Sequence, residues 1–171
     1  YRQDTPALVL DEVVDLRGLA VVDGGSYAFL FAGEASAERL VEVRDAINDA
    51  WPHGRAWLKD ETPPGWHVAT ASRFPELIVQ ADPGHGVIRS RDRYYIMTAG
   101  DHGWAPEFTD MHGIFIAAGP RIPRGLLIEP LGVVDLYPMM RDVLNLPPAI
   151  VDGDPGVLLP LLAPASRTPQ E

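Results

Sequence analysis

Histidines are the residues of this chain best suited to bind a metal or to transfer a proton. There are five of them and no cysteine, so a metal site would have to use histidine, aspartate, glutamate or backbone oxygen. For four of the five, an ordinary structural role explains the residue at least as well as a ligand role does. These are His53 and His85, expected in turns, His67, expected in a strand where it could line a cavity, and His112, expected to pack before an apolar strand.

His102 is different, because it lies in the turn Gly100-Asp-His-Gly103 at the end of an apolar run. The two glycines free the backbone beside it, and Asp101 could turn toward the same ion. Neutral imidazole and carboxylate together suit zinc. Two ligands are too few for a tight site, so we expect the remaining ligands to come from elsewhere.

Other functional classes find little support in the sequence. No serine lies in a G-x-S-x-G elbow, no G-x-G-x-x-G phosphate loop is present, and nothing points to the paired carboxylates of a glycosidase. The net charge of −10 argues against binding to duplex nucleic acid. No apolar run approaches the roughly 18 residues that span a bilayer. Because the sequence starts at Tyr1, without a methionine, we expect it to be a mature or truncated piece of something longer.

The elements that must position His102 follow from turn residues and apolar periodicity. Asp23-Gly24-Gly25 between two apolar runs predicts a hairpin over residues 19–32. Ser36 is expected to cap a helix that ends near Ala50, with an apolar face, and residues 55–59 form another strand. The face consists of Ala37, Leu40, Val41, Arg44, Ile47 and Asn48. This β-β-α-β order predicts a small α+β, cap-like subdomain over residues 1–65.

Residues 66–171 are expected to form part of a larger α/β core. Two strands should flank the His102 turn, and the second is continuously apolar, as a strand covered on both faces should be. A helix is expected from Leu136 to about Leu144, with Asp135 as its N-cap. The strands of this part are predicted at 66–69, 76–81, 87–90, 94–97 and 114–118, and residues 157–162 form a last docking segment.

An ordered series of motifs adds a family resemblance. The series is WLKDETP at 57–63, RFPELIV at 73–79, ADPG at 81–84, GDHGW at 100–104, DMHGIFIAAGP at 110–120, VVDLYPMMRDVLNL at 133–146 and DGD at 152–154. It resembles the C-terminal part of the nucleotide pyrophosphatase/phosphodiesterase family (type I phosphodiesterases) of the alkaline phosphatase superfamily. The resemblance implies an alkaline phosphatase-like α/β core, present only in part, and a periplasmic or secreted protein.

The resemblance also implies a site with two zinc ions that hydrolyses phosphodiester or pyrophosphate bonds of a nucleotide-like substrate through a covalent intermediate on a threonine. His102 matches the family's final histidine, which completes one zinc site, and is the only residue carried over. A competing alignment places residues 101–103 on the family's earlier Asp-His-Gly motif, which would make Asp101 a ligand too. The long stretch at 55–84 favours the later histidine. Ala118 stands where many relatives have a histidine.

The nucleophile and most metal ligands of the family have no counterpart here. Thr62, Thr70, Thr98 and Thr109 lie in other sequence contexts. We therefore expect the chain to be the C-terminal portion of a zinc hydrolase and to be inactive alone. Two alternatives stay open: a non-catalytic fragment that binds a partner or forms a homodimer through exposed strand edges, and a related hydrolase of phosphonates, phospholipid headgroups or sulfate esters.

Overall fold

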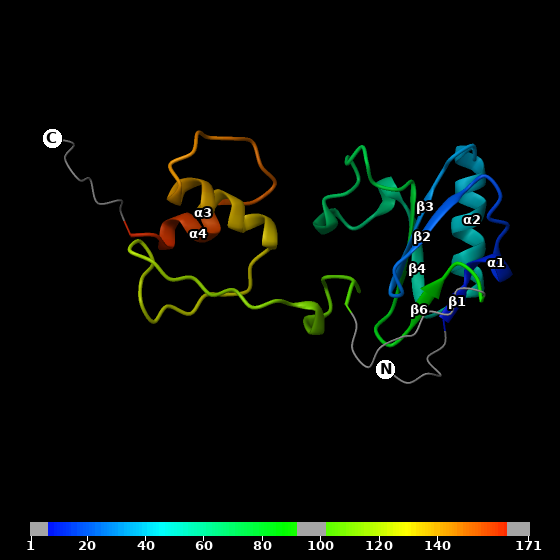
Figure 1. The fold of residues 1–171 in the computed structure, drawn as a ribbon, viewed down its shortest axis with the longest axis horizontal. Helices are drawn as coiled ribbons and strands as arrows, with labels where there is room; N and C mark the ends of the chain where they lie inside the picture. Colours follow the sequence, from blue (N-terminus) through cyan, green and yellow to red (C-terminus); the bar gives the residue numbers. More distant parts are fainter. Residues whose placement is uncertain (1–6, 92–101, 164–171) are drawn as a thin grey trace. The chain divides into compact units, whose positions relative to one another are not determined.

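The computed structural model describes residues 7–91 and 102–163 (Figure 1). It divides into two compact units, Tyr1–Gly113 and Ile114–Glu171. The strand predicted at 94–97 and Asp101, the neighbour of the predicted ligand, lie outside the described residues. Among the residues that are described, no helix combines the length and the apolar character needed to cross a membrane.

An antiparallel sheet of four strands forms the centre of the first unit, in the order β2-β3-β5-β4. The strands are β2 (Ala20–Asp23), β3 (Tyr27–Phe31), β4 (Gly54–Leu58) and β5 (Leu77–Ala81). Gly24 donates its amide to the carbonyl of Tyr27 at 2.8 Å, and Gly25 has a φ of 85°. The predicted hairpin is confirmed, and Gly25 supplies the positive φ that its turn requires.

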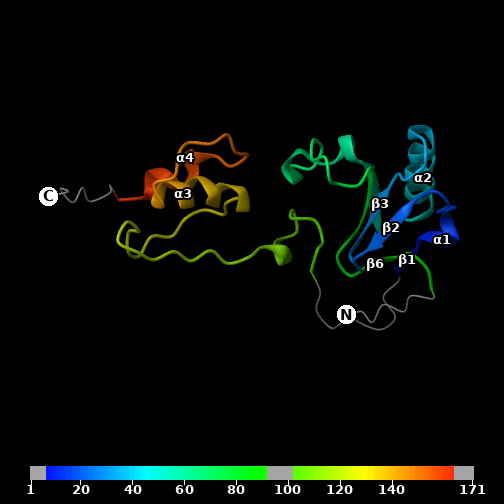
Figure 2. The same ribbon diagram turned by 45° about the horizontal axis from the view of Figure 1, so that its top comes forward.

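Helix α2 (Ala37–Ala50) covers one face of this sheet (Figures 1 and 2). The Ser36 side chain accepts the amide of Arg39 at 3.3 Å, so the predicted N-cap is confirmed. The face of α2 that packs on the sheet carries Leu40, Val43 and Ile47. Leu40 and Ile47 belong to the predicted face, but Val41 is exposed and Val43 takes its place. The observed spacing of three and four residues still follows the helical period.

A two-stranded parallel sheet lies beside the larger one. Its strands are β1 (Ala7–Val9) and β6 (Gly86–Ile88), and a short helix, α1 (Leu10–Val13), follows β1. An isolated bridge between Gly25 and Val87 joins the two sheets at the hairpin turn. The strand predicted at 87–90 is present as β6, which begins one residue earlier and ends two residues earlier.

The strand predicted at 66–69 is wrong. Pro64–Trp66 forms a 3₁₀ turn after a similar turn at Lys59–Glu61, and His67 has a left-handed φ of 54°. Proline fixes φ and lacks an amide donor, which favours the turn over a ladder here. The Trp66 ring instead meets the Trp57 ring edge-on, with centroids 5.2 Å apart.

The first unit continues well beyond the boundary predicted at residue 65. The predicted β-β-α-β order is present as β2, β3, α2 and β4, but β5 then inserts between β3 and β4. A strand from beyond residue 65 therefore lies at the centre of the same sheet. The observed division comes after Gly113 instead.

Two helices form the regular part of the second unit: α3 (Leu136–Val143) and α4 (Pro155–Leu158). The predicted helix at 136–144 and the docking segment at 157–162 are both found, the latter as α4 and the 3₁₀ turn Leu159–Leu161. Asp135 is the N-cap residue of α3, as predicted, but its side chain makes no capping hydrogen bond to the helix. Its carboxylate accepts the amides of Gly132 and Asp154, at 3.0 and 2.8 Å, and so ties α3 to the loop before α4.

The strand predicted at 114–118 is also wrong. Ile114 and Ile116 are 91% and 85% exposed, and the segment has no regular secondary structure. An apolar strand covered on both faces needs neighbouring strands to satisfy its backbone. The described residues of the second unit contain no strand that could pair with it. Its composition therefore indicates burial that this unit by itself does not provide.

Candidate functional site

His102 lies in a turn of the first unit that consists of residues 102–104. The first residue of this turn is exposed and the last is buried. The His102 side chain is exposed, whereas Trp104 is only 5% exposed and belongs to the hydrophobic core. Gly103, between them, has a φ of 95°. The turn thus presents the imidazole to solvent while the tryptophan holds the backbone in place.

Hydrogen bonds from the sheet region reach each of these three residues. Ser26 Oγ donates to the carbonyl of His102 at 2.8 Å. Gln80 Nε2 donates to the carbonyl of Gly103 at 3.2 Å. Trp104 Nε1 donates to the carbonyl of His85 at 3.3 Å, in the turn between β5 and β6. Contacts from three separate segments therefore fix the backbone that carries His102.

Ser26 and Gln80 are both buried, with 0% and 8% of their surfaces exposed. Gln80 Nε2 also donates to the carbonyl of Ser26 at 2.9 Å, and the amide of Ala81 donates to the same carbonyl at 2.9 Å. A buried polar group without a partner costs about 1–3 kcal/mol. Part of the bonding that these side chains need comes from the His102 turn.

The space at Gly103 explains why a glycine follows His102. A Cβ at this position would lie 2.7 Å from Ser26 Oγ and 3.2 Å from the Tyr27 ring. Its positive φ is also unfavourable for a residue with a side chain. From the sequence, Gly103 was expected to free the backbone beside His102. In the structure it also allows the turn to approach the sheet closely.

The other four histidines do not join His102 in a cluster. The rings of His53 and His85 stack with centroids 4.1 Å apart, and His85 Nδ1 is buried without a hydrogen-bond partner among the described residues. His67 is exposed at the end of its 3₁₀ turn. His112, predicted to be packed, is exposed, and its Nε2 lies 3.1 Å from the carbonyl of Pro106. Within residues 7–91 and 102–163, no three histidine, aspartate or glutamate side chains are placed to hold a metal together.

The roles of Ser26 and Gln80 were missed by sequence reasoning, which rejected Ser26, like the other serines, as a nucleophile and gave it no other role. The available signal is the polar Gln80 within the apolar run LIVQA, all of which is buried as β5. A polar side chain in a fully buried strand must find a partner. The sequence does not show which partner, since Ser26 and His102 are 76 residues apart.

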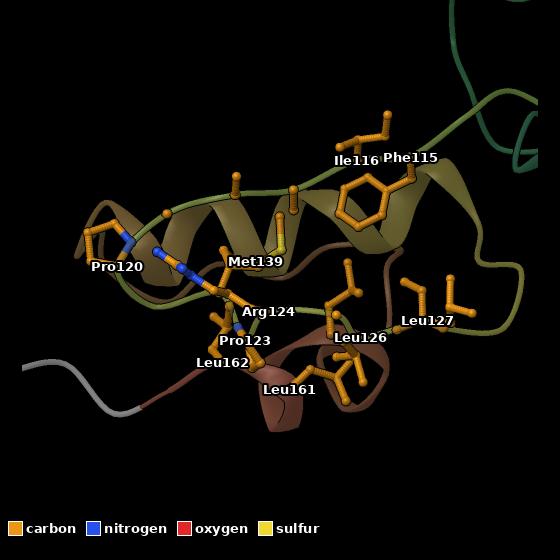
Figure 3. Close-up of a pocket in the computed structure, with 17 residues that line it drawn as sticks. Phe115, Ile116, Pro120, Pro123, Arg124, Leu126, Leu127, Met139, Leu161 and Leu162 are labelled. Atoms are coloured by element: carbon orange, nitrogen blue, oxygen red, sulfur yellow. The ribbon is translucent and has the colours of Figure 1, made fainter.

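The second unit contains an apolar pocket of about 750 Å³ (Figure 3). Its walls are the coil at 115–128, Met139 of α3, and Leu158, Leu161 and Leu162 near the C-terminal end of the unit. Arg124 is the charged side chain in this lining. A catalytic pocket usually combines apolar walls with several convergent polar groups. This lining is better suited to packing against another apolar surface.

Comparison with known proteins identifies the family. No family model matches the chain. Ectonucleotide pyrophosphatase/phosphodiesterase family member 7 of Mus musculus is 32% identical over 148 residues, which cover 86% of this chain and 33% of that protein. Bis(5'-adenosyl)-triphosphatase enpp4 of Xenopus laevis is 31% identical over 104 residues, 61% of this chain and 22% of that protein. The chain belongs to the nucleotide pyrophosphatase/phosphodiesterase family.

Solved structures of this family confirm the predicted fold class. Human ectonucleotide pyrophosphatase/phosphodiesterase 5 matches with a TM-score of 0.78 and 26% identity over 94% of this chain and 41% of that one. An inactive variant of the murine protein, solved in complex with AMP, matches equally well. The chain thus has an alkaline phosphatase-like α/β fold in part. It spans about a third of the length of the mouse relative.

Proposed function

We propose that this nucleotide pyrophosphatase/phosphodiesterase chain is the C-terminal portion of a zinc-dependent hydrolase of phosphodiester or pyrophosphate bonds. In this proposal His102 completes one of two zinc sites. The observation that supports it is the combination of an exposed imidazole with a backbone held by Ser26, Gln80 and Trp104. A metal ligand must be accessible to the ion and held in a defined orientation.

The donor chemistry of His102 fits zinc, but one histidine cannot hold the ion. A neutral ring nitrogen is a normal zinc ligand at about 2.0–2.1 Å. The described residues contain no complete ligand group, so the proposal requires ligands outside them. Bound zinc would supply Lewis acidity and lower the pKa of a coordinated nucleophile. The contribution of this chain is to orient one ligand.

The proposed substrate is a small phosphorylated, nucleotide-like molecule. The inactive variant of murine ectonucleotide pyrophosphatase/phosphodiesterase 5 was solved in complex with AMP. The Xenopus laevis relative is named as a bis(5'-adenosyl)-triphosphatase. Because this chain carries a net charge of −10, a divalent metal would be needed to hold an anionic substrate beside it. A periplasmic or secreted location is part of the same proposal.

Turnover of a p-nitrophenyl phosphodiester tests the proposal. The chain alone, with added zinc, is expected to show no turnover, because the nucleophile and other ligands are lacking. The longer protein, expressed from the gene with its upstream sequence, is expected to bind two zinc ions and to hydrolyse the diester. A longer protein that binds no zinc and shows no turnover would refute the function. Turnover by the chain alone would refute only its inactivity.

A second candidate function is self-association, and it rests on the exposed apolar side chains of the second unit. Leu127 and Val133 are 96% and 80% exposed, in addition to Ile114 and Ile116. Large apolar patches mark association surfaces. The isolated chain is expected to form homodimers, and Leu127→Asp should shift it toward monomer in light scattering. A chain that is monomeric at all concentrations would count against this candidate.

A further inference from the structure

We propose that Ser26 and Gln80 are positioning residues that orient His102 for metal binding before the ion arrives. This inference rests on the proposed function, because it assumes that His102 is a zinc ligand. Neither side chain is expected to touch the metal or the substrate. Both act through the backbone of the turn, on the carbonyls of His102 and Gly103.

Ser26 connects the turn to the hairpin between β2 and β3. Its hydroxyl, which has a single proton to donate, gives that proton to the carbonyl of His102. Its own carbonyl accepts the amide of Ala81 and the side chain of Gln80. Because Ser26 is fully buried and bonded on both sides, it cannot shift without breaking sheet contacts. The carbonyl of His102 is therefore tied to a rigid point.

Gln80 extends this connection to the next residue of the turn. Its register partner in β3 is Tyr27, so the two side chains lie on the same face of the sheet, near Gly103. The amide nitrogen has two protons, and it donates to the carbonyls of Ser26 and Gly103 at 2.9 and 3.2 Å. An apolar side chain at this position would pack in β5 but would leave both carbonyls with one donor fewer.

Rigidity of the turn matters more to a metal ligand than to the fold. Zinc–nitrogen distances vary by only about 0.2 Å in well-formed sites, and the ring of His102 is placed by its backbone. A turn that must be ordered on binding lowers the affinity by the cost of that ordering. Loss of Ser26 or Gln80 should therefore weaken zinc binding even where the variant stays folded.

The test compares zinc affinity with fold stability in the longer protein, using competition with a chelator and chemical unfolding. Ser26→Ala is expected to weaken zinc binding about tenfold, the lower end of the range for groups that support metal ligands. Gln80→Leu, which keeps the volume, is expected to act in the same direction and serves if Ser26→Ala does not fold. Asn48→Ala is the matched control, because the two bonds of the Asn48 side chain, at 2.8 and 3.0 Å, both go to Ala56 in β4 rather than to the turn.

The outcomes separate positioning from a structural role. Weaker zinc binding in each of Ser26→Ala and Gln80→Leu that folds, with Asn48→Ala destabilised but unchanged in affinity, supports the inference. Unchanged affinity in a folded variant of either residue overturns it, as does an equal loss in Asn48→Ala. His102→Ala is measured alongside. If His102→Ala binds zinc normally, His102 is not a ligand and the proposed function fails. If His102→Ala loses zinc but the variants of Ser26 and Gln80 do not, only the positioning inference fails.

Discussion

His102→Ala in the longer protein is expected to weaken zinc binding by at least about 100-fold. Groups that only support a metal ligand contribute about 10- to 100-fold to affinity, so loss of the ligand itself should exceed that range. The catalytic efficiency, kcat/KM, toward a p-nitrophenyl phosphodiester should fall at least as far, since the reaction depends on both zinc ions. Zinc content by elemental analysis and steady-state kinetics measure the two effects.

His112→Ala is the matched control for this prediction. His112 is also an exposed histidine of the first unit, and its ring contacts the carbonyl of Pro106 within its own turn. Its replacement should leave zinc affinity and kcat/KM unchanged. Asp101→Asn distinguishes the two alignments of the turn, because only the competing one makes Asp101 a ligand. Normal zinc binding by His102→Ala would refute both alignments.

Features set by local chemistry could be predicted from the sequence. Asp23-Gly24-Gly25 specified the hairpin, because a tight turn needs the positive φ that Gly25 adopts. Ser36 specified the start of α2 through a hydrogen bond to an amide three residues along the chain. The motif around His102 predicts a metal ligand, and this assignment stays a prediction. These signals lie within a few residues of the feature they determine.

Features that depend on distant partners could not be predicted in the same way. Asp135 has the residue type of an N-cap, but its carboxylate binds the amide of Asp154, 19 residues away. Ile114 and Ile116 have the composition of a buried strand, but burial requires strands that the described part of the second unit does not contain. The same limitation hid the contact between Ser26 and His102, which is determined by the packing of the turn on the sheet.

Gly103→Ala is expected to destabilise the isolated chain by about 2–6 kcal/mol in urea unfolding. A side chain at a φ of 95° costs about 1–3 kcal/mol, and a Cβ placed 2.7 Å from Ser26 Oγ adds an overpacking cost of about 1–3 kcal/mol. Gly84→Ala is the matched control, because Gly84 has a φ of 87° but no heavy atom of the described residues would lie within 4 Å of its new Cβ. The stability lost in Gly84→Ala should reflect backbone strain alone.

The double variant Ser26→Ala/Gly103→Ala separates the steric cost from the backbone cost. Removing Ser26 Oγ removes the closest contact of the new methyl group, so Gly103→Ala should cost less in the Ser26→Ala background than in the native chain. Such non-additivity is expected for residues in direct contact. Ser26→Ala should leave the cost of Gly84→Ala unchanged. Equal costs of Gly103→Ala in both backgrounds would mean that the turn does not pack against Ser26, and would remove the structural basis for positioning His102.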